Sequence, residues 1–307
     1  MALGYWHNIG SPRGRIIVME HSYHGDTIGA MSVGARGVFN RAYAPLLFDV
    51  DTIPFPVAGN EQATLDVLEA LCRSPDKPAA LIVEPLILGA GGMLVYSAEV
   101  LRNMAQICAA HDVLFIADEV MTGWGRTGTL FACEQAGITP DILCTAKGLT
   151  GGSIPLAATL STARIFDAHC SEDRAQMFFH SSSFTANPIA CAAAAANIAI
   201  WEQEDVRGRI SGLNAHMAAR LARISDHPAI ENPRILGAIA AVDLKVSSGS
   251  GYLSNIAPAL RAFFLERGLL LRPLGNTIYV MPPYCISPQQ TDQIFDAIEA
   301  AAKQFGG

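Results

Sequence analysis

The strongest constraint on the fold is an alternation between short apolar runs and longer helical stretches, which extends from Arg15 to about Leu160. The short runs are rich in β-branched residues and have the length of strands. Such an alternation is typical of βαβ units, so we expect an α/β fold with a mostly parallel sheet. The expected strands are 16–19, 80–84, 114–118, 142–145 and 156–160.

Two acids stand at the ends of expected strands. The stretch 98–111 carries apolar residues at helical spacing, such as Val100 and Met104, and predicts an amphipathic crossover helix. The strands that this helix joins end at Glu84 and Asp118. In open α/β sheets, ligands bind outside the carboxyl ends of the strands, so both acids are expected to face a site.

The pattern changes after His180, where a polar loop leads into a very Ala-rich helix with Pro188 near its first turn. The small residues of this helix indicate close helix packing. We predict a large domain over 1–203 and a smaller α+β domain over 204–307. The smaller domain is expected to contain helices at 206–224 and 288–303, strands near 238–246, 269–271 and 277–281, and a flexible loop at 247–251.

The composition excludes several classes of partner. The chain has 307 residues, of which 50% are hydrophobic and 16% charged, and its formal net charge is -7. No basic run marks a surface for nucleic acid or an anionic membrane, and no apolar stretch approaches the ~20 residues of a membrane span. Seven irregularly spaced cysteines and the lack of a secretory signal favour a cytoplasmic protein without disulfides or a metal.

The strongest local motif is FIADEVMTGWGRTG at 115–128, where an apolar strand ends in Asp118 and a glycine-rich loop follows. In DILCTAKGLTGG, at 141–152, a second strand ends at Lys147 beside glycines. A strand-end Asp can be a structural cap, and a lone lysine can extend its amine to solvent. A buried lysine without a purpose would be costly, so the pair is a candidate for chemistry.

Together, these two segments resemble the fold-type I, class III aminotransferases. The resemblance implies a pyridoxal 5'-phosphate (PLP) cofactor and two catalytic residues. Asp118 would keep the ring nitrogen protonated, and Lys147 would form the Schiff base. A cationic ring is the electron sink that this chemistry needs, and it requires an anionic partner. Lys147 would act as a neutral amine to attack and to shuttle the proton.

Further segments match the cofactor contacts of that family. SYHGDT, with Tyr23, His24 and Gly25, resembles a loop whose aromatic residue stacks on the cofactor ring, and Val120 would pack on the opposite face. A Glu-Pro segment implies that Glu84 lies near the ring and the substrate. Without the resemblance, Tyr23 could be a core aromatic and Glu84 a structural ion-pair acid.

The loop HSSSFTANPIA, residues 180–190, aligns with a family loop that gives a hydroxyl to the phosphate of the partner subunit's cofactor. The candidate residues are Ser182 and Ser183. Ser183 stands in the place of the usual threonine, and Ser181 stands in that of the usual glycine. The resemblance therefore implies a homodimer whose interface is part of the site.

The stretch 269–290 closely resembles the diaminopelargonate aminotransferases, the class III subgroup of biotin synthesis. That resemblance implies transfer of the amino group of S-adenosylmethionine to 8-amino-7-oxononanoate. Arg272 would pair with the substrate carboxylate and Tyr279 would line the pocket, while Asp26 and Arg126 would help to accept two dissimilar substrates. Structural roles stay open for both arginines. The alternative is an ω-amine or 4-aminobutyrate transaminase.

Residues 1–6 predict the end of a helix, since Asn8, Gly10 and Pro12 follow as stop signals. Family members carry a further N-terminal segment, whose Gly-Ser turn at a helix N-terminus holds the cofactor phosphate. The resemblance covers essentially the whole chain but does not include that turn. A third hypothesis is therefore a truncated, catalytically silent homologue that dimerises.

Overall fold

The computed structural model describes residues 1–37, 40–246, 251 and 254–306. The chain divides into two compact units, which are treated one at a time. The first unit comprises Met1–Gly91, Tyr96–Trp124 and Phe131–Ile200, and the second comprises Gly92–Val95, Gly125–Leu130 and Trp201–Gly307. None of the described helices is both long enough and apolar enough to cross a membrane.

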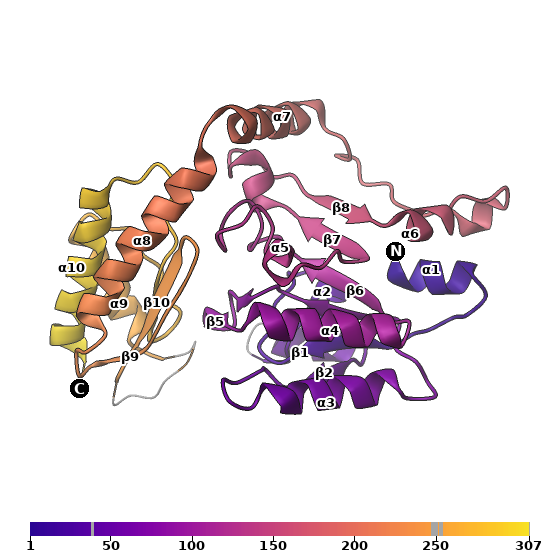
Figure 1. Ribbon diagram of the computed structural model, residues 1–307, viewed down its shortest axis with the longest axis horizontal. Helices are drawn as coiled ribbons and strands as arrows, with labels where there is room; N and C mark the ends of the chain where they lie inside the picture. The colour runs from indigo at the N-terminus through magenta and orange to yellow at the C-terminus, as the bar shows by residue number, and fades with distance from the viewer. Residues whose placement is uncertain (38–39, 247–250, 252–253, 307) are drawn as a thin grey trace. The chain divides into compact units, whose positions relative to one another are not determined.

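A six-stranded sheet forms the centre of the first unit, with strand order β2-β1-β3-β6-β7-β8 (Figure 1). Its strands are β1 (Ile16–Met19), β2 (Asp51–Ile53), β3 (Ala80–Val83), β6 (Leu114–Asp118), β7 (Ile142–Thr145) and β8 (Ala158–Ser161), and the short β4 (Ile87–Leu88) lies outside it. All neighbouring pairs in the sheet are parallel except β7 with β8. This arrangement confirms the expected α/β fold.

The sequence predicted four strands of this sheet closely. β1, β6 and β7 have the predicted bounds, and β3 ends one residue earlier. β8 runs from Ala158 to Ser161 instead of 156–160, because its antiparallel pairing begins with Ala158 opposite Thr145, at the end of β7. The apolar residues before Ala158 therefore lie outside the ladder.

The register of the sheet brings strand ends together. Ala117 lies opposite Leu143, and Asp118 lies opposite Cys144 one residue further along. β1 and β3 are parallel to β6 and β7, so the loops that follow all four strands leave from the same edge. Side chains from distant parts of the sequence can therefore share one site at this edge.

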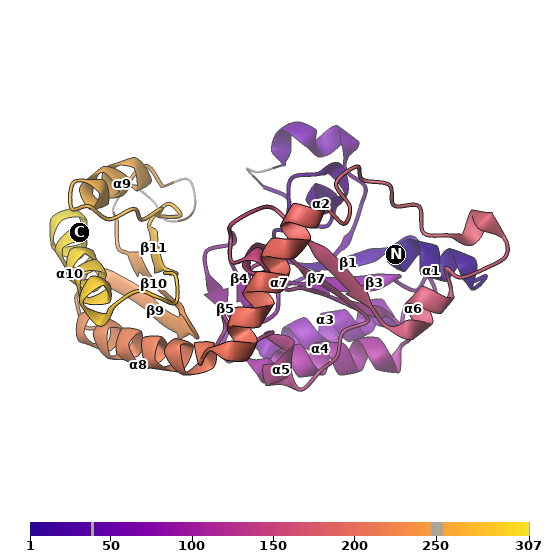
Figure 2. The same cartoon turned by 90° about the horizontal axis from the view of Figure 1, so that it is seen from above.

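Helices cover the sheet. α3 and α4 run side by side on one face (Figures 1 and 2), and Ser97 caps α4 by accepting a hydrogen bond from the backbone of Val100. The predicted N-terminal helix is confirmed as α1, in which Trp6 donates its indole N–H to the carbonyl of Ala79 at 2.8 Å. The helices of this unit are α1 (Ala2–Asn8), α2 (Ile28–Ser32), α3 (Glu61–Cys72), α4 (Ala98–Ala110), α5 (Cys133–Ala136), α6 (Ala163–Asp167) and the 3-10 helices η1 (Arg41–Leu46), η2 (Lys147–Thr150) and η3 (Arg174–Gln176).

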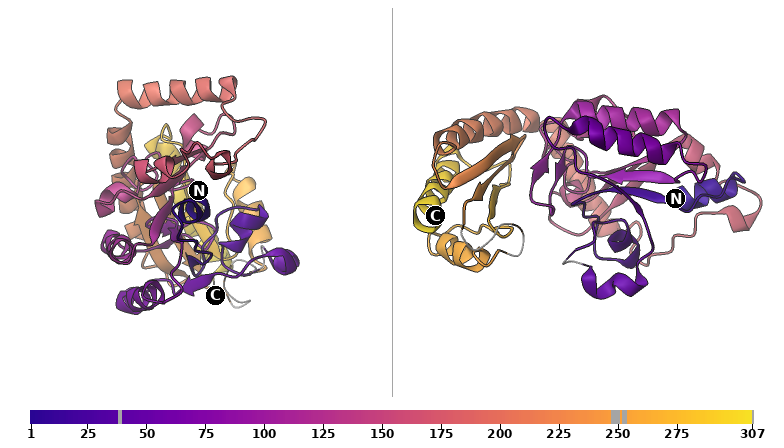
Figure 3. Two further views of the ribbon diagram at one scale, coloured as in Figure 1. Left: turned by 90° about the vertical axis from the view of Figure 1, so that its right-hand side faces the viewer. Right: turned by 90° about the horizontal axis from the view of Figure 1, so that it is seen from below.

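The Ala-rich helix is α7 (Pro188–Gln203), most of which belongs to the first unit. Figures 1 and 3 show it lying outside the sheet and the helices that cover the sheet. Only Ala190 and Ala194 are buried along it, so the described residues of this chain do not supply the close packing that was predicted. The small residues leave the apolar side chains between them exposed, including Ile189 at 71%.

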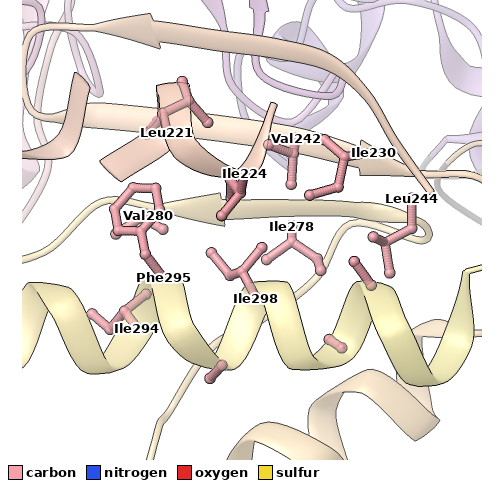
Figure 4. Close-up of a cluster of buried hydrophobic side chains, with 14 of the residues drawn as sticks. Leu221, Ile224, Ile230, Val242, Leu244, Ile278, Val280, Ile294, Phe295 and Ile298 are labelled. Atoms are coloured by element: carbon pink, nitrogen blue, oxygen red, sulfur yellow. The ribbon is translucent and has the colours of Figure 1, made fainter. Parts of the chain in front are cut away.

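The second unit is an antiparallel sheet of order β11-β10-β9 with helices packed on it. Its elements are β5 (Leu94–Val95), α8 (Val206–Ile224), β9 (Ile230–Leu236), β10 (Ile239–Leu244), α9 (Ala257–Leu265), β11 (Thr277–Val280) and α10 (Pro288–Phe305). α8 and α10 lie side by side (Figure 3), and Figure 4 shows side chains of β10 and β11 meeting Phe295 and Ile298 of α10. A capping box at Ser287 and Gln290 begins α10.

One predicted strand of this unit was wrong and two elements, β9 and α9, were not predicted, while α8, β10, β11 and α10 were close to their predicted bounds. No strand forms at 269–271, because these residues have no neighbouring strand among the described ones and Leu270 is 82% exposed. β9 was not predicted, because Asn232 and Pro233 interrupt its apolar pattern. The loop predicted at 247–251 lies outside the described residues except for Gly251.

Candidate active site

The parallel edge of the first unit gathers the residues singled out in the sequence. Tyr23 and His24 follow β1, Glu84 follows β3, Asp118 ends β6 and Lys147 follows β7. The strands that carry them are neighbours in the order β1-β3-β6-β7. Hydrogen bonds between the loops that follow these strands hold several of the side chains together.

Asp118 and His24 form the centre of the site. The Oδ2 atom of Asp118 lies 2.7 Å from Nδ1 of His24, and its Oδ1 atom accepts a hydrogen bond of 3.1 Å from the backbone N–H of Val120. The two side chains are 10% and 3% exposed. Because both oxygens of this nearly buried carboxylate are held, its orientation is fixed before any ligand binds.

The second nitrogen of His24, Nε2, is buried and has no hydrogen-bond partner among the described residues. A buried polar atom of this kind is usually satisfied by another group, such as a bound molecule. The site therefore offers both a fixed anion and an unsatisfied ring nitrogen in one place.

Glu84 ties the loop after β1 to the loop after β3. Its two carboxylate oxygens accept hydrogen bonds of 3.1 Å from the backbone N–H groups of Tyr23 and Gly89. Burial raises the pKa of Glu84 to about 7, although the nearby His24 and both hydrogen bonds act to lower it. Tyr96, which sequence reasoning missed, donates its hydroxyl to the carbonyl of Glu84 at 2.8 Å.

The loop after β1 also orients Tyr23 and Asp26. The hydroxyl of Tyr23 donates to Oδ1 of Asp26 at 2.8 Å, so the predicted ring wall and the predicted substrate acid are in direct contact. Gly25 between them has a φ of 125°, a backbone conformation that favours glycine. The turn therefore depends on glycine at this position.

Lys147 is the first residue of η2 and lies on the wall of a pocket of about 800 Å³. It is exposed, so the expectation of a buried lysine in a strand end is wrong: the strand ends at Thr145, and the chain turns before the lysine. The walls also include Val120, Ser182 and the unpredicted His180. Ser183 is exposed and is not part of the wall of this pocket.

Asn197 is a second residue that sequence reasoning missed. Its side-chain amide, on α7, donates to the carbonyls of Gly148 and Leu149 at 2.9 and 3.2 Å and so holds the turn that follows Lys147. A lone Asn in an otherwise apolar helix was visible in the sequence. Its contact, 49 positions away along the chain, was not.

Three predicted substrate residues belong to the second unit. Arg126 donates from Nη1 to the carbonyl of Pro282 at 2.6 Å, and its guanidinium lies 4.6 Å from the ring centre of Tyr284. Burial raises the pKa of Tyr284 to about 12, which Arg126 opposes. Tyr279 is half-buried on β11, opposite Ala241.

Arg272 is exposed on the wall of a pocket of about 620 Å³ within the second unit. It makes no hydrogen bond or ion pair with the residues that the structure describes. Its charge is therefore available for an anionic group.

The residues of the first unit fit PLP. The cofactor needs an anion near its ring nitrogen, and Asp118 is a carboxylate whose position is fixed by His24 and Val120. The carbonyl carbon of the cofactor needs an amine, and Lys147 lies on the pocket wall with its amine available. The cofactor phosphate needs hydroxyl groups, such as that of Ser182 on the same wall. These residues are the ones that would hold it.

Comparison with known proteins agrees with this geometry. The model of the family "Aminotransferase class-III" matches residues 1–302. An adenosylmethionine-8-amino-7-oxononanoate aminotransferase of Synechococcus elongatus is 46% identical, over 97% of this chain and 71% of the relative. The protein of the same name from Geobacter sulfurreducens is 36% identical, over 100% of this chain and 72% of its own length.

Solved structures lead to the same family. The crystal structure of adenosylmethionine-8-amino-7-oxononanoate aminotransferase from Methanocaldococcus jannaschii aligns with a TM-score of 0.93 at 32% identity, over 99% of this chain and 71% of that one. A PLP-bound amine transaminase from an uncultivated Pseudomonas species aligns with a TM-score of 0.90 at 32% identity, over 99% and 73%. The chain therefore belongs to the class III aminotransferases, a family of transaminases of fold-type I that use PLP as cofactor.

Proposed function

We propose that this chain transfers the amino group of S-adenosylmethionine to 8-amino-7-oxononanoate, as a step of biotin synthesis. The observation that carries the chemistry is the Asp118–His24 pair at the end of β6, beside the strand that leads to Lys147. The substrates are supported by the name that the relatives share, at identities of 33% to 46%.

Lys147 is the proposed catalytic lysine. Its Nζ binds the cofactor and later, as a free amine, moves the proton at the amino-bearing carbon of the substrate. The bound cofactor supplies an electron sink for the bond broken at that carbon and carries the amino group between the two half-reactions. The open pocket wall on which Lys147 lies supports this role, because the amine can reach a bound substrate there.

Asp118 holds a proton on the cofactor ring nitrogen in this proposal, and His24 positions Asp118. The 2.7 Å contact between them fixes one carboxylate oxygen, which leaves little freedom to reorganise during the reaction. Tyr23 and Val120 are the proposed walls on the two ring faces, and Gly25 permits the turn. Glu84 holds the backbone of Tyr23 and lies close to His24.

The second unit supplies the proposed substrate contacts. Arg272, which has no partner among the described residues, suits a substrate carboxylate. Tyr279 and Arg126 are further proposed substrate residues of this unit. Asp26, which contacts Tyr23 in the first unit, is proposed as a substrate residue on its own account.

We also propose that the protein is a homodimer in the cytoplasm. Exposed apolar side chains, here called the 177–200 surface, flank the proposed phosphate residues Ser182 and Ser183 along the chain. The 177–200 surface consists of Met177, Phe178, Phe179, Phe184, Ile189, Ile198 and Ile200. Apolar surface of this extent is typical of an interface, and the seven free cysteines fit a reducing compartment.

The second candidate function is that of an ω-amine or 4-aminobutyrate transaminase. The similarity to an amine transaminase, with a TM-score of 0.90 at 32% identity, favours it. The third candidate, a catalytically silent dimer, differs from both in having no turnover.

Amino-donor profiling decides among these functions. The purified protein is given PLP with one amino donor and one acceptor at a time, either 8-amino-7-oxononanoate or a 2-oxo acid, and product formation is measured. We expect turnover with S-adenosylmethionine and none in a Lys147→Ala variant. Turnover with ω-amines alone would contradict the proposed substrates. No turnover with any pair of donor and acceptor would favour the third candidate, the catalytically silent dimer.

A further inference from the structure

Trp124 contacts the chain on both sides of Lys147. Its indole Nε1 donates a hydrogen bond of 2.9 Å to Oγ1 of Thr145, two residues before the lysine. On the other side it packs against Gly148, where an added Cβ would lie only 2.5 Å from the Cβ of Trp124. One side chain therefore limits where the backbone can run both before and after Lys147.

The backbone at Lys147 needs such support. Its φ is 37°, in the left-handed region, where a residue with a side chain is strained. Strained positions of this kind persist only where the surroundings fix them. The turn after Lys147 is held by Asn197 and by the backbone N–H of Gly152, which donates to the carbonyl of Lys147 at 3.0 Å. Before the lysine, Trp124 holds Thr145.

A buried carboxylate, that of Glu119, holds the chain on both sides of Trp124. Glu119 is fully buried and accepts hydrogen bonds from Oγ1 of Thr122 at 2.6 Å and from the backbone N–H groups of Ala132 and Cys133 at 3.0 and 2.9 Å. Its own carbonyl accepts from the N–H of Gly123 at 3.1 Å. Glu119 therefore fixes the segment that carries Trp124 on both sides. It holds Thr122 and Gly123 before the tryptophan, and Ala132 and Cys133 after it.

A second aromatic ring supports the indole. Phe131 meets Trp124 edge to face with ring centres 6.0 Å apart, and an added Cβ at Gly123 would lie 3.2 Å from that ring. Glycine at 123 and at 148 thus makes room for the same aromatic cluster. These contacts fix the indole against η2, where Lys147 begins the turn.

We propose that Trp124 is a positioning residue for the reaction: by holding Thr145 and Gly148, it sets the backbone conformation of Lys147 and thereby the direction of Nζ. This inference rests on the proposed role of Lys147. A misplacement of about 1 Å at a reacting group can slow a reaction roughly 100-fold, so the support of this backbone has a measurable consequence.

The test measures how fast Lys147 reacts with PLP. The full-length protein is mixed with PLP, quenched with borohydride at successive times, digested, and the labelled Lys147 peptide is quantified by mass spectrometry. We expect Trp124→Ala to slow labelling roughly 10- to 100-fold. Trp124→Phe keeps an aromatic ring and Thr145→Val keeps the shape of the side chain, but both lose the hydrogen bond, so each should slow labelling about fivefold. The double variant should be no slower than either single variant, because one interaction is lost in all three.

Trp6→Phe is the matched control. It also removes a buried indole hydrogen bond, of 2.8 Å to Ala79, at the opposite end of the strands. It should therefore lower stability to a similar degree and leave the labelling rate within about twofold. Urea unfolding of every variant separates a loss of stability from a misplaced Lys147. If Trp124→Ala does not fold, Trp124→Phe and Thr145→Val still test the proposal.

The turnover parameters provide a second readout. In Trp124→Phe, kcat should fall about fivefold while KM for the amino donor stays within about twofold, because the proposed contact acts on Lys147 and leaves donor binding unchanged. Labelling rates equal to those of the unaltered protein in Trp124→Ala, Trp124→Phe and Thr145→Val would overturn the role of Trp124 and leave the proposed function standing. No labelling of Lys147 in the unaltered protein would instead overturn the proposed function, on which the inference rests.

Discussion

Two regions of the chain differ in how completely their side chains find partners within the chain. One is the edge of the sheet after β6 and β7, and the other is the 177–200 surface. At the sheet edge, Asp118 is nearly buried and both of its oxygens have partners. On the 177–200 surface, Phe179 and Phe184 are 75% and 77% exposed. The anionic side of the proposed site is thus built within one chain, whereas the loop with Ser182 and Ser183 is flanked along the chain by exposed apolar side chains that a partner surface would cover.

The largest effect is expected at the self-contained edge. Asp118→Asn keeps the shape and the contact with His24 but removes the charge, so kcat should fall roughly 100- to 1,000-fold, as for the loss of a key electrostatic group. Asp292→Asn is the matched control, since Asp292 also contacts a histidine, His216, at 2.9 Å, on the surface of the second unit. Steady-state kinetics should show the loss only in the first variant. Equal kcat in both would contradict the role of Asp118.

The second prediction concerns the 177–200 surface. Phe184→Asp places a charge among the apolar groups, so it should raise the dimer dissociation constant at least about tenfold, which sedimentation velocity can measure. Val57→Asp introduces the same charge at a side chain that is 59% exposed elsewhere on the first unit, and it should leave the dimer intact. An unaltered protein that sediments as a monomer at all concentrations would remove the proposed interface.

A smaller effect is expected from Glu84, whose burial distinguishes the sheet edge. Its pKa is raised to about 7 in the folded protein, so between pH 4.5 and 7 the unfolded chain loses the proton while the folded protein keeps it. The free energy of unfolding should therefore fall as pH rises through this window, by up to about 3 kcal/mol, and level off above it. Besides burial, the nearby His24 lowers the pKa of Glu84 and Asp118 raises it.

Urea titrations at several pH values test this dependence. Glu84→Gln cannot ionise, so its stability relative to the unaltered protein should rise between pH 4.5 and 7. The exposed Glu99 provides the control, because Glu99→Gln should leave the pH dependence unchanged. Parallel pH curves for Glu84→Gln and the unaltered protein would show that Glu84 is ionised in the folded state over this range.

The same contrast explains what the sequence could predict. β6 and β7 were placed correctly because an apolar run ends abruptly at each, and Asp118 and Lys147 follow from those ends. The exposure of Lys147 could not be predicted, because it depends on a turn that begins after Thr145.

Side chains that hold a distant backbone carbonyl could not be predicted from the sequence either. Tyr96 and Asn197 donate to backbone carbonyl groups of distant segments. Because every residue has such a carbonyl, the sequence does not show which one will be the partner. The packing of α7 was predicted from its small residues, but such residues indicate close approach without indicating whether the neighbour belongs to the same chain.

The most direct test of the account is whether PLP becomes attached to Lys147. Borohydride reduction after addition of PLP, followed by peptide mass spectrometry, should place the label on Lys147, and Lys147→Ala should lose the label and at least about 1,000-fold in turnover. Lys303→Ala, which removes an exposed lysine paired with Glu299, should change neither. A label on another lysine, or full turnover in Lys147→Ala, would contradict the central claim.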